Sequence, residues 1–117
     1  MSDLSNQSTP YDQAFFDALR QGSQQSAQVI VPLLLDWIRP KSVIDVGCGD
    51  GTWLSIFQSF GVETIQGIDG DYVDHHTLQI PPECFTAVDL KRPLSESRAF
   101  DLVVCLEVAE HLSLIHI

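Results

Sequence analysis

The residues best suited to chemistry form a short loop of alternating glycines behind an apolar run. The run Val43–Val46 is β-branched apart from one carboxylate, Asp45, as is typical of a central parallel strand covered on both faces. Three glycines then follow at alternate positions: Gly47, Gly49 and Gly51. Because glycine has no Cβ, it adopts positive φ readily and lets backbone N–H groups approach a bound molecule. The pattern predicts a strand followed by a ligand-binding loop, with a plain tight turn as the alternative.

A helical pattern follows the loop, with apolar positions at Leu54 and Phe57 and a stop at Gly61. A dinucleotide-binding loop reads G-x-G-x-x-G and directs a helix N-terminus at a pyrophosphate. This loop reads G-x-G-x-G. The shorter spacing counts against a nicotinamide-dependent oxidoreductase or epimerase, which stays open as an alternative.

Two further apolar segments carry an acid at or near their end. Ile65–Asp69 ends in a carboxylate roughly 20 residues beyond the glycines, the distance that a strand–loop–helix–strand unit requires. An ionised acid at the C-terminal end of a strand can accept hydrogen bonds from both hydroxyls of a ribose, so Asp69 is expected to bind one. The alternative is a turn, Asp69-Gly70-Asp71. The segment Phe85–Leu90 contains Asp89, for which a helix cap or a loop acid is the alternative.

The stretch 100–112 begins Phe-Asp-Leu-Val-Val, with Asp101 at the start of an expected fourth strand. Together the four segments, from Val43 to Leu112, resemble in order the class I S-adenosylmethionine-dependent methyltransferases, with G-x-G-x-G as motif I and Phe-Asp-Leu-Val-Val in motif IV. The resemblance implies an α/β fold of the doubly wound Rossmann-like type. It also implies that the fold stops after about the fourth strand and carries N-terminal helices.

The resemblance also implies which residues hold the cofactor, S-adenosylmethionine. Asp45 is expected to take its amino group, the glycine loop its methionine part and Asp69 its ribose. Asp89 would bind the adenine amino group and Leu90 would line the base. The full set of expected cofactor contacts is Asp45, Gly47, Cys48, Gly49, Gly51, Asp69, Gly70, Asp89, Leu90 and Leu106.

The implied reaction is in-line transfer of the sulfonium methyl group to an O, N or C acceptor. Glu107 or His111 is the candidate general base, on position alone. A non-catalytic relative that binds S-adenosylmethionine would keep the same binding residues. Only an activity screen separates that alternative from an enzyme.

A metal site is the alternative use of the same stretch. On a helix, Glu107, Glu110 and His111 would stand at i, i+3 and i+4 and face one side. The pattern resembles the metal-binding segment of small-RNA 2′-O-methyltransferases and the corresponding region of ubiquinone-pathway O-methyltransferases. Because E-x-x-E-H-L also occurs in family members not known to need metal, no metal is assigned. The pair His75-His76 is expected in a solvated loop, since adjacent side chains point in different directions.

The amino-acid composition limits the classes of partner that the protein is expected to bind. Sixteen acids against six bases give a formal charge of −10, which argues against nucleic acid and favours a small-molecule acceptor. The N-terminus lacks the features of a signal peptide, and the run 29–35 is too short to cross a bilayer, so a cytoplasmic protein without a membrane role is expected. The cysteines, Cys48, Cys84 and Cys105, form no C-x-x-C pair and are expected to be reduced thiols. The oligomeric state cannot be read from the sequence.

Residues 1–40 predict a helical preface of two helices. The first would start with Thr9 as cap and Pro10 at the first position, and end at Gly22. The second would end before Pro40, with Pro32 causing a kink or a later start. Core packing is the expected use of their apolar faces, and a cofactor lid is the alternative.

Residues 41–112 are expected to form the N-terminal half of the methyltransferase domain. Residues 113–117 resemble a translated sequencing-library adaptor, so we expect a non-native tail there. The fourth strand would then expose an edge carrying Val103, Val104 and Leu106, which favours aggregation and poor solubility.

Overall fold

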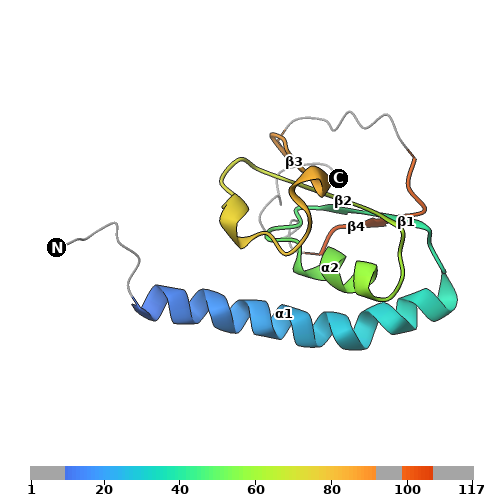
Figure 1. Ribbon diagram of the computed structural model, residues 1–117, viewed down its shortest axis with the longest axis horizontal. Helices are drawn as coiled ribbons and strands as arrows, with labels where there is room; N and C mark the ends of the chain where they lie inside the picture. Colours follow the sequence, from blue (N-terminus) through green and yellow to red (C-terminus); the bar gives the residue numbers. More distant parts are fainter. Residues whose placement is uncertain (1–9, 92–98, 107–117) are drawn as a thin grey trace.

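The computed structural model describes residues 10–91 and 99–106, with the side chains of α1 described from Asp17 onward. Two helices and four strands make up this part of the chain (Figure 1). In chain order they are α1 (Pro10–Trp37), β1 (Ser42–Val46), α2 (Thr52–Ser59), β2 (Thr64–Asp69), β3 (Phe85–Ala87) and β4 (Leu102–Val104). Two short 3₁₀ turns, η1 (His75–Thr77) and η2 (Pro82–Cys84), lie between β2 and β3.

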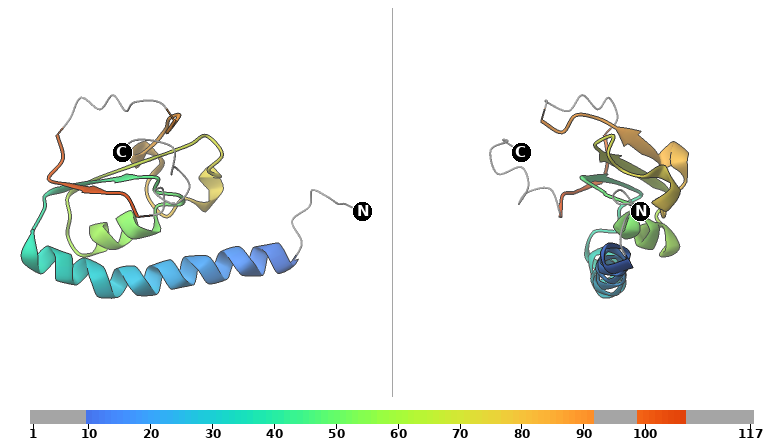
Figure 2. Two further views of the ribbon diagram at one scale, coloured as in Figure 1. Left: turned by 180° about the vertical axis from the view of Figure 1, so that it is seen from behind. Right: turned by 90° about the vertical axis from the view of Figure 1, so that its left-hand side faces the viewer.

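The four strands form one parallel sheet in the order β3-β2-β1-β4. In the central strand, Asp45 is paired with Gly67 of β2 and with Val104 of β4. Both described α-helices lie on the same face, with α2 between the sheet and α1 (Figure 2). This arrangement confirms the predicted α/β fold with β1 as a central parallel strand, flanked by β2 and β4. The prediction that both faces of β1 are covered is met for one face by the described helices.

The core forms between the sheet, α2 and the inner face of α1. Val43, Leu54 and Phe57 are almost fully buried there, as are Ala27 and Val31 of α1. Burying one such large apolar side chain stabilises the fold by roughly 1.5–3 kcal/mol. The core therefore fixes α2, and with it the glycine loop that precedes it.

Helix α2 ends where the sequence predicts. Gly61 has φ +103, its N–H donates to Gln58 O at 3.0 Å, and Val62 N–H donates to Phe57 O at 3.1 Å. This pair of bonds is a Schellman motif, which satisfies the last carbonyls of a helix and favours glycine at the left-handed position. Val62 and Phe57 both belong to the core, so the cap also aims the chain into β2.

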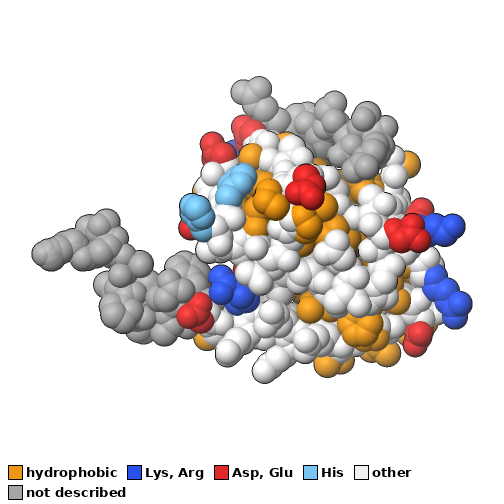
Figure 3. Space-filling view, viewed as in Figure 1, with side chains coloured by type: hydrophobic (Ala, Val, Ile, Leu, Met, Phe, Trp, Pro, Cys, Tyr) orange, Lys and Arg blue, Asp and Glu red, His pale blue; other side chains and the backbone are white. Residues whose placement is uncertain are grey.

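The prediction of two N-terminal helices is wrong, because α1 runs unbroken through Gly22 and Pro32. An interior glycine costs a helix only about 1 kcal/mol and an interior proline about 3 kcal/mol. Burial of Ala27 and Val31 against the domain offsets these penalties. The C-terminal part of α1 exposes apolar side chains, and Figure 3 shows hydrophobic side chains at the surface there; the exposed ones include Val29, Ile30, Leu33 and Trp37.

None of the helices in residues 10–91 and 99–106 combines the length and the hydrophobicity that are needed to cross a bilayer.

The last two strands are shorter than the sequence predicts. β3 ends at Ala87, so Asp89 and Leu90 lie in the turn that follows it. Asp101 precedes β4, as predicted, and ties it to β1: Lys41 N–H donates to Asp101 Oδ2 at 2.8 Å, and Asp101 N–H donates to Ser42 Oγ at 2.9 Å.

The side chains of β4 alternate between the two faces of the sheet. Val103 is 62% exposed, whereas Val104 is buried in the core. The prediction that Val104 lines an exposed edge is therefore wrong, because successive strand residues point to opposite faces.

The chain after β2 folds back against the glycine loop. Gln79 N–H donates to Asp50 O at 2.7 Å, and the neighbouring Ile80 is buried. A Cβ built on Gly51 would lie 2.8 Å from Ile80 Cγ1. Gly51, at φ +84, is therefore required by the protein's own packing as well as by its backbone conformation.

Replacing Gly51 with alanine should destabilise the complete protein by about 2–5 kcal/mol, since a left-handed non-glycine residue costs roughly 1–2 kcal/mol and overpacking about 1–3 kcal/mol. Urea unfolding of the two proteins measures the change. A loss below about 0.5 kcal/mol, the usual range of a surface substitution, would contradict the contact with Ile80.

Replacing Gly22 with alanine should change the free energy of unfolding in the opposite direction. In the interior of an exposed helix the substitution is expected to stabilise by about 1 kcal/mol, because a Cβ there would meet nothing within 4 Å. A helix that ended at a left-handed Gly22 would be destabilised instead. The same unfolding experiment distinguishes the two.

Candidate functional site

The glycine loop follows β1 and is tied to the end of β2. Gly47, Gly49 and Gly51 have φ of 81°, 58° and 84°, which confirms the predicted left-handed conformations. Gly47 N–H and Cys48 N–H both donate to Ile68 O, at 2.7 and 3.2 Å. The glycines serve different ends: a Cβ on Gly49 would meet nothing within 4 Å, whereas one on Gly51 would strike the protein itself. Gly49 is thus the loop residue whose backbone faces open space.

The carboxylate of Asp69 joins this loop to the turn after β2. Although it is only 3% exposed, its Oδ2 accepts a hydrogen bond from Gly49 N–H at 2.7 Å and its Oδ1 accepts one from Gly70 N–H at 2.7 Å. The Tyr72 hydroxyl also donates to Oδ1. The residue predicted to bind a ribose therefore lies at the C-terminal end of its strand, in contact with the predicted glycine loop.

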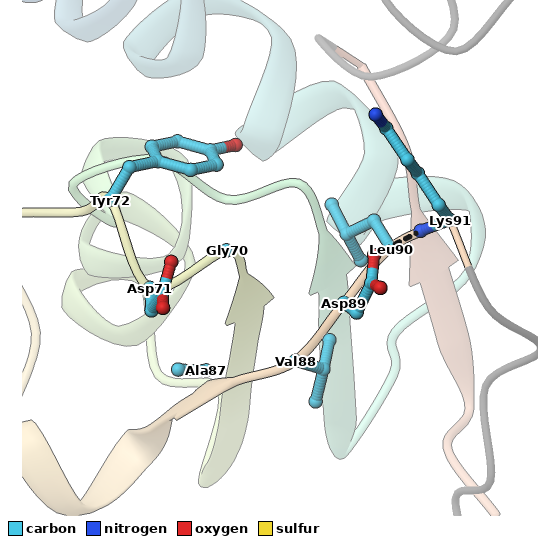
Figure 4. Close-up of a pocket in the computed structure, with 8 residues that line it drawn as sticks. All are labelled: Gly70, Asp71, Tyr72, Ala87, Val88, Asp89, Leu90 and Lys91. Carbon is cyan, nitrogen blue, oxygen red and sulfur yellow. Dashed lines mark hydrogen bonds between the residues drawn. The ribbon is translucent and has the colours of Figure 1, made fainter.

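A first cavity, the strand-end hollow, opens where β2 and β3 end. It has a volume of about 510 Å³. Its walls are two segments, Gly70–Tyr72 and Ala87–Lys91 (Figure 4). Asp89 Oδ1 accepts a hydrogen bond from Lys91 N–H at 2.9 Å, which fixes the turn. Gly70, Asp89 and Leu90, three residues predicted as cofactor contacts, thus line one cavity.

A second cavity, the glycine-loop hollow, lies between the loop and α1. It has a volume of about 520 Å³ and includes Cys48 and Gly49 in its lining. Arg20 of α1 donates from Nε to Asp50 Oδ2 at 2.9 Å, and both residues line the hollow. The N-terminal helix therefore forms a wall of the candidate site as well as part of the core.

The hydrogen-bond partners of Asp69 lie on both hollows, although Asp69 itself is buried and lines neither. Its partner Gly49 lines the glycine-loop hollow, and its partners Gly70 and Tyr72 line the strand-end hollow. Asp69 thus connects the backbone of one hollow to that of the other. Among the charged residues of the two linings acids outnumber bases: Asp50, Asp71, Asp74 and Asp89 against Arg20 and Lys91. Such a lining favours a ligand that offers hydroxyl donors and positive charge.

Asp45 and Cys48 lie behind the loop surface. Asp45 is buried in β1, with 4% of its side chain exposed, and it lines neither hollow. Burial, followed by the charges of Asp45 and Asp69, raises the pKa of the Cys48 thiol far above its ordinary value. The thiol is therefore neutral at physiological pH and is not an activated nucleophile. All three cysteines are free thiols, as predicted.

Among the described residues, the predicted cofactor contact Leu106 is not brought into the site. Leu106 lies beyond β4, is 54% exposed and lines neither hollow. Glu107, Glu110 and His111, the candidates for base and metal ligand, fall outside the described residues. His75 and His76 are exposed in η1, where Figure 3 shows imidazoles at the surface.

Tyr72, Arg20 and Asp50 are among the site residues that the sequence did not predict. Tyr72 follows Asp69 by three positions, a spacing that a closer reading of the turn could have flagged. Arg20 and Asp50 are separated by 30 positions, and no local sequence pattern predicts their contact.

Comparison with known proteins agrees with this architecture. A family model described as a methyltransferase domain matches residues 18–116. The ubiquinone biosynthesis O-methyltransferase of Neisseria meningitidis serogroup C (strain 053442) is 31% identical over 109 residues, which cover 80% of this chain and 45% of that protein. The enzyme of the same name from Ralstonia nicotianae is 36% identical over 100 residues, covering 71% of this chain and 40% of that protein.

The chain spans less than half the length of these curated relatives. The family model nevertheless covers most of it, including every described residue of the two hollows. The chain therefore belongs to the S-adenosylmethionine-dependent methyltransferase family.

Proposed function

We propose that the complete protein transfers the methyl group of S-adenosylmethionine to an oxygen atom of a small molecule. The transfer to oxygen rests on the curated relatives, which are named O-methyltransferases of ubiquinone biosynthesis. An acceptor of that chemical kind, a hydroxylated small molecule, is the proposed substrate class. A cytoplasmic location remains a prediction.

The observation that carries the proposal is the Asp69 carboxylate, whose hydrogen-bond partners line both hollows. S-adenosylmethionine is an elongated molecule whose ribose lies between adenine and the methionine part. Its adenine fits the strand-end hollow with Asp89 and Leu90, its ribose hydroxyls suit the Asp69 carboxylate, and its methionine part suits the open space over Gly49. The donor set therefore fits the cofactor that the family implies.

The charges of the cofactor and of the hollows support the same fit. The methionine part carries a sulfonium and an ammonium cation beside one carboxylate, and acids outnumber bases among the charged residues that line the hollows. Asp45, with its charge buried behind the loop, is the proposed partner of the ammonium group. A negative site with low-dielectric walls raises the local concentration of a cationic ligand.

When bound, the cofactor supplies a methyl group already activated by the positive sulfur. The protein has to bind the cofactor and the acceptor, orient them and exclude water, since correct alignment of two reactants accounts for much of such a rate enhancement. Glu107 or His111 remains the proposed general base. The set of Glu107, Glu110 and His111 remains only an alternative for a divalent cation, which titration with Mg²⁺ would test.

A nicotinamide dinucleotide suits this loop less well. The N-terminus of α2, where a pyrophosphate would bind, is already used by the Asp50 carboxylate: its Oδ1 accepts from Thr52 N–H at 3.0 Å and from Thr52 Oγ1 at 2.6 Å. A second anion there would meet like charge. A non-catalytic relative that binds S-adenosylmethionine remains the second candidate, because its binding site would be identical.

Ligand-induced stabilisation separates these cofactors. S-adenosylhomocysteine at about 100 times its dissociation constant should stabilise the complete protein by about 2.7 kcal/mol. NAD at the same concentration should leave the melting temperature unchanged. Stabilisation by NAD alone would reverse the assignment.

Asp69→Ala should weaken S-adenosylhomocysteine binding at least tenfold, which is about 1.4 kcal/mol, because two hydroxyl donors lose an ionised acceptor. Glu63→Ala is the matched control, since Glu63 is an exposed acid just before the opposite end of β2. Calorimetric titration of both variants, with melting curves to verify folding, makes the measurement. Unchanged affinity in Asp69→Ala would rule out the ribose contact.

A further inference from the structure

Tyr72, which lines the strand-end hollow, is hydrogen-bonded through its hydroxyl to Asp69. It donates to Oδ1, the oxygen that also accepts from Gly70 N–H. The ring lies over Gly70: a Cβ built there would overlap it, at 2.6 Å from Cδ2. Figure 4 shows Tyr72 on the wall of the hollow across from Asp89 and Lys91. The tyrosine therefore covers the turn after β2, between Asp69 and the strand-end hollow.

Within the described part of the chain, few contacts hold this side chain in place. Tyr72 is 76% exposed, and its hydroxyl is hydrogen-bonded to Asp69. Burial of the hydroxyl and its bond to Asp69 raise the pKa of Tyr72 to about 12, so the phenol is protonated and can donate at neutral pH. The ring can leave the turn at the cost of few contacts.

We propose that Tyr72 is a gate on the nucleoside site, whose hydroxyl takes the place of a ribose hydroxyl on Asp69 until the cofactor displaces it. The inference rests on the proposed function and deepens it. The gate would keep the buried carboxylate supplied with a donor in the free protein and release it when a better matched pair of donors arrives. A ligand without a vicinal diol gains no such exchange.

The gate should weaken the apparent affinity of the free protein for the cofactor. When the competent conformation is only partly populated, the apparent dissociation constant rises by the inverse of that population. Removing the hydroxyl of Tyr72 removes the competitor and leaves the ring available as a wall. The substitution should therefore strengthen binding, the reverse of what loss of a ligand-binding residue would do.

The test is calorimetric titration of the complete protein with S-adenosylhomocysteine. Tyr72→Phe should bind roughly three- to tenfold more tightly than wild type, the range that one net hydrogen bond corresponds to. Tyr11→Phe, which removes the hydroxyl of the chain's other tyrosine, should bind like wild type. Equal or weaker binding by Tyr72→Phe would overturn the gate while leaving the proposed function intact. Absence of binding by wild type and variant alike would overturn both.

A spectroscopic measurement reports on the gate itself. After 3-fluorotyrosine labelling of the complete protein, the ¹⁹F resonance of Tyr72 is identified as the one that Tyr72→Phe removes. Saturation with S-adenosylhomocysteine should shift this resonance, and Asp69→Asn should shift it in the same direction without ligand. A resonance that ligand saturation leaves unmoved would contradict displacement of the hydroxyl.

Discussion

The carboxylate of Asp69 is the interaction on which the site depends. Parallel strands bring their C-terminal ends to one edge of a sheet, where the loops that follow must be held in register. Asp69 does this by accepting one backbone N–H from the glycine loop and one from its own turn. Leaving a buried donor unsatisfied costs about 1–3 kcal/mol, so the carboxylate stabilises both loops in the arrangement that forms the two hollows.

Different glycines of the loop serve the packing of the fold and the proposed binding of the ligand. Gly51 makes room for Ile80, and Gly49 keeps its backbone open toward a hollow. Contacts from distant parts of the chain then fix the loop from outside, through Arg20 of α1 and the backbone of Gln79. A rigid backbone surface results, suited to a cofactor that must be oriented before an acceptor can react.

Local patterns predicted the elements whose structure is decided locally. The apolar run of β1, the left-handed glycines and the stop at Gly61 follow from side-chain periodicity and backbone sterics. The two-helix prediction failed because the cost of an interior glycine or proline was weighed without the packing that offsets it. Ile80 and the Arg20–Asp50 pair were missed because only the folded chain brings them to the loop. The roles of Glu107 and His111 remain predictions.

The most direct test is a crystal structure of the complete protein with S-adenosylhomocysteine. The account predicts that both ribose hydroxyls donate to the Asp69 carboxylate, that adenine lies in the strand-end hollow beside Leu90, and that the Tyr72 hydroxyl has left Oδ1. A nucleoside bound elsewhere, or bound while Tyr72 still donates to Asp69, would contradict it.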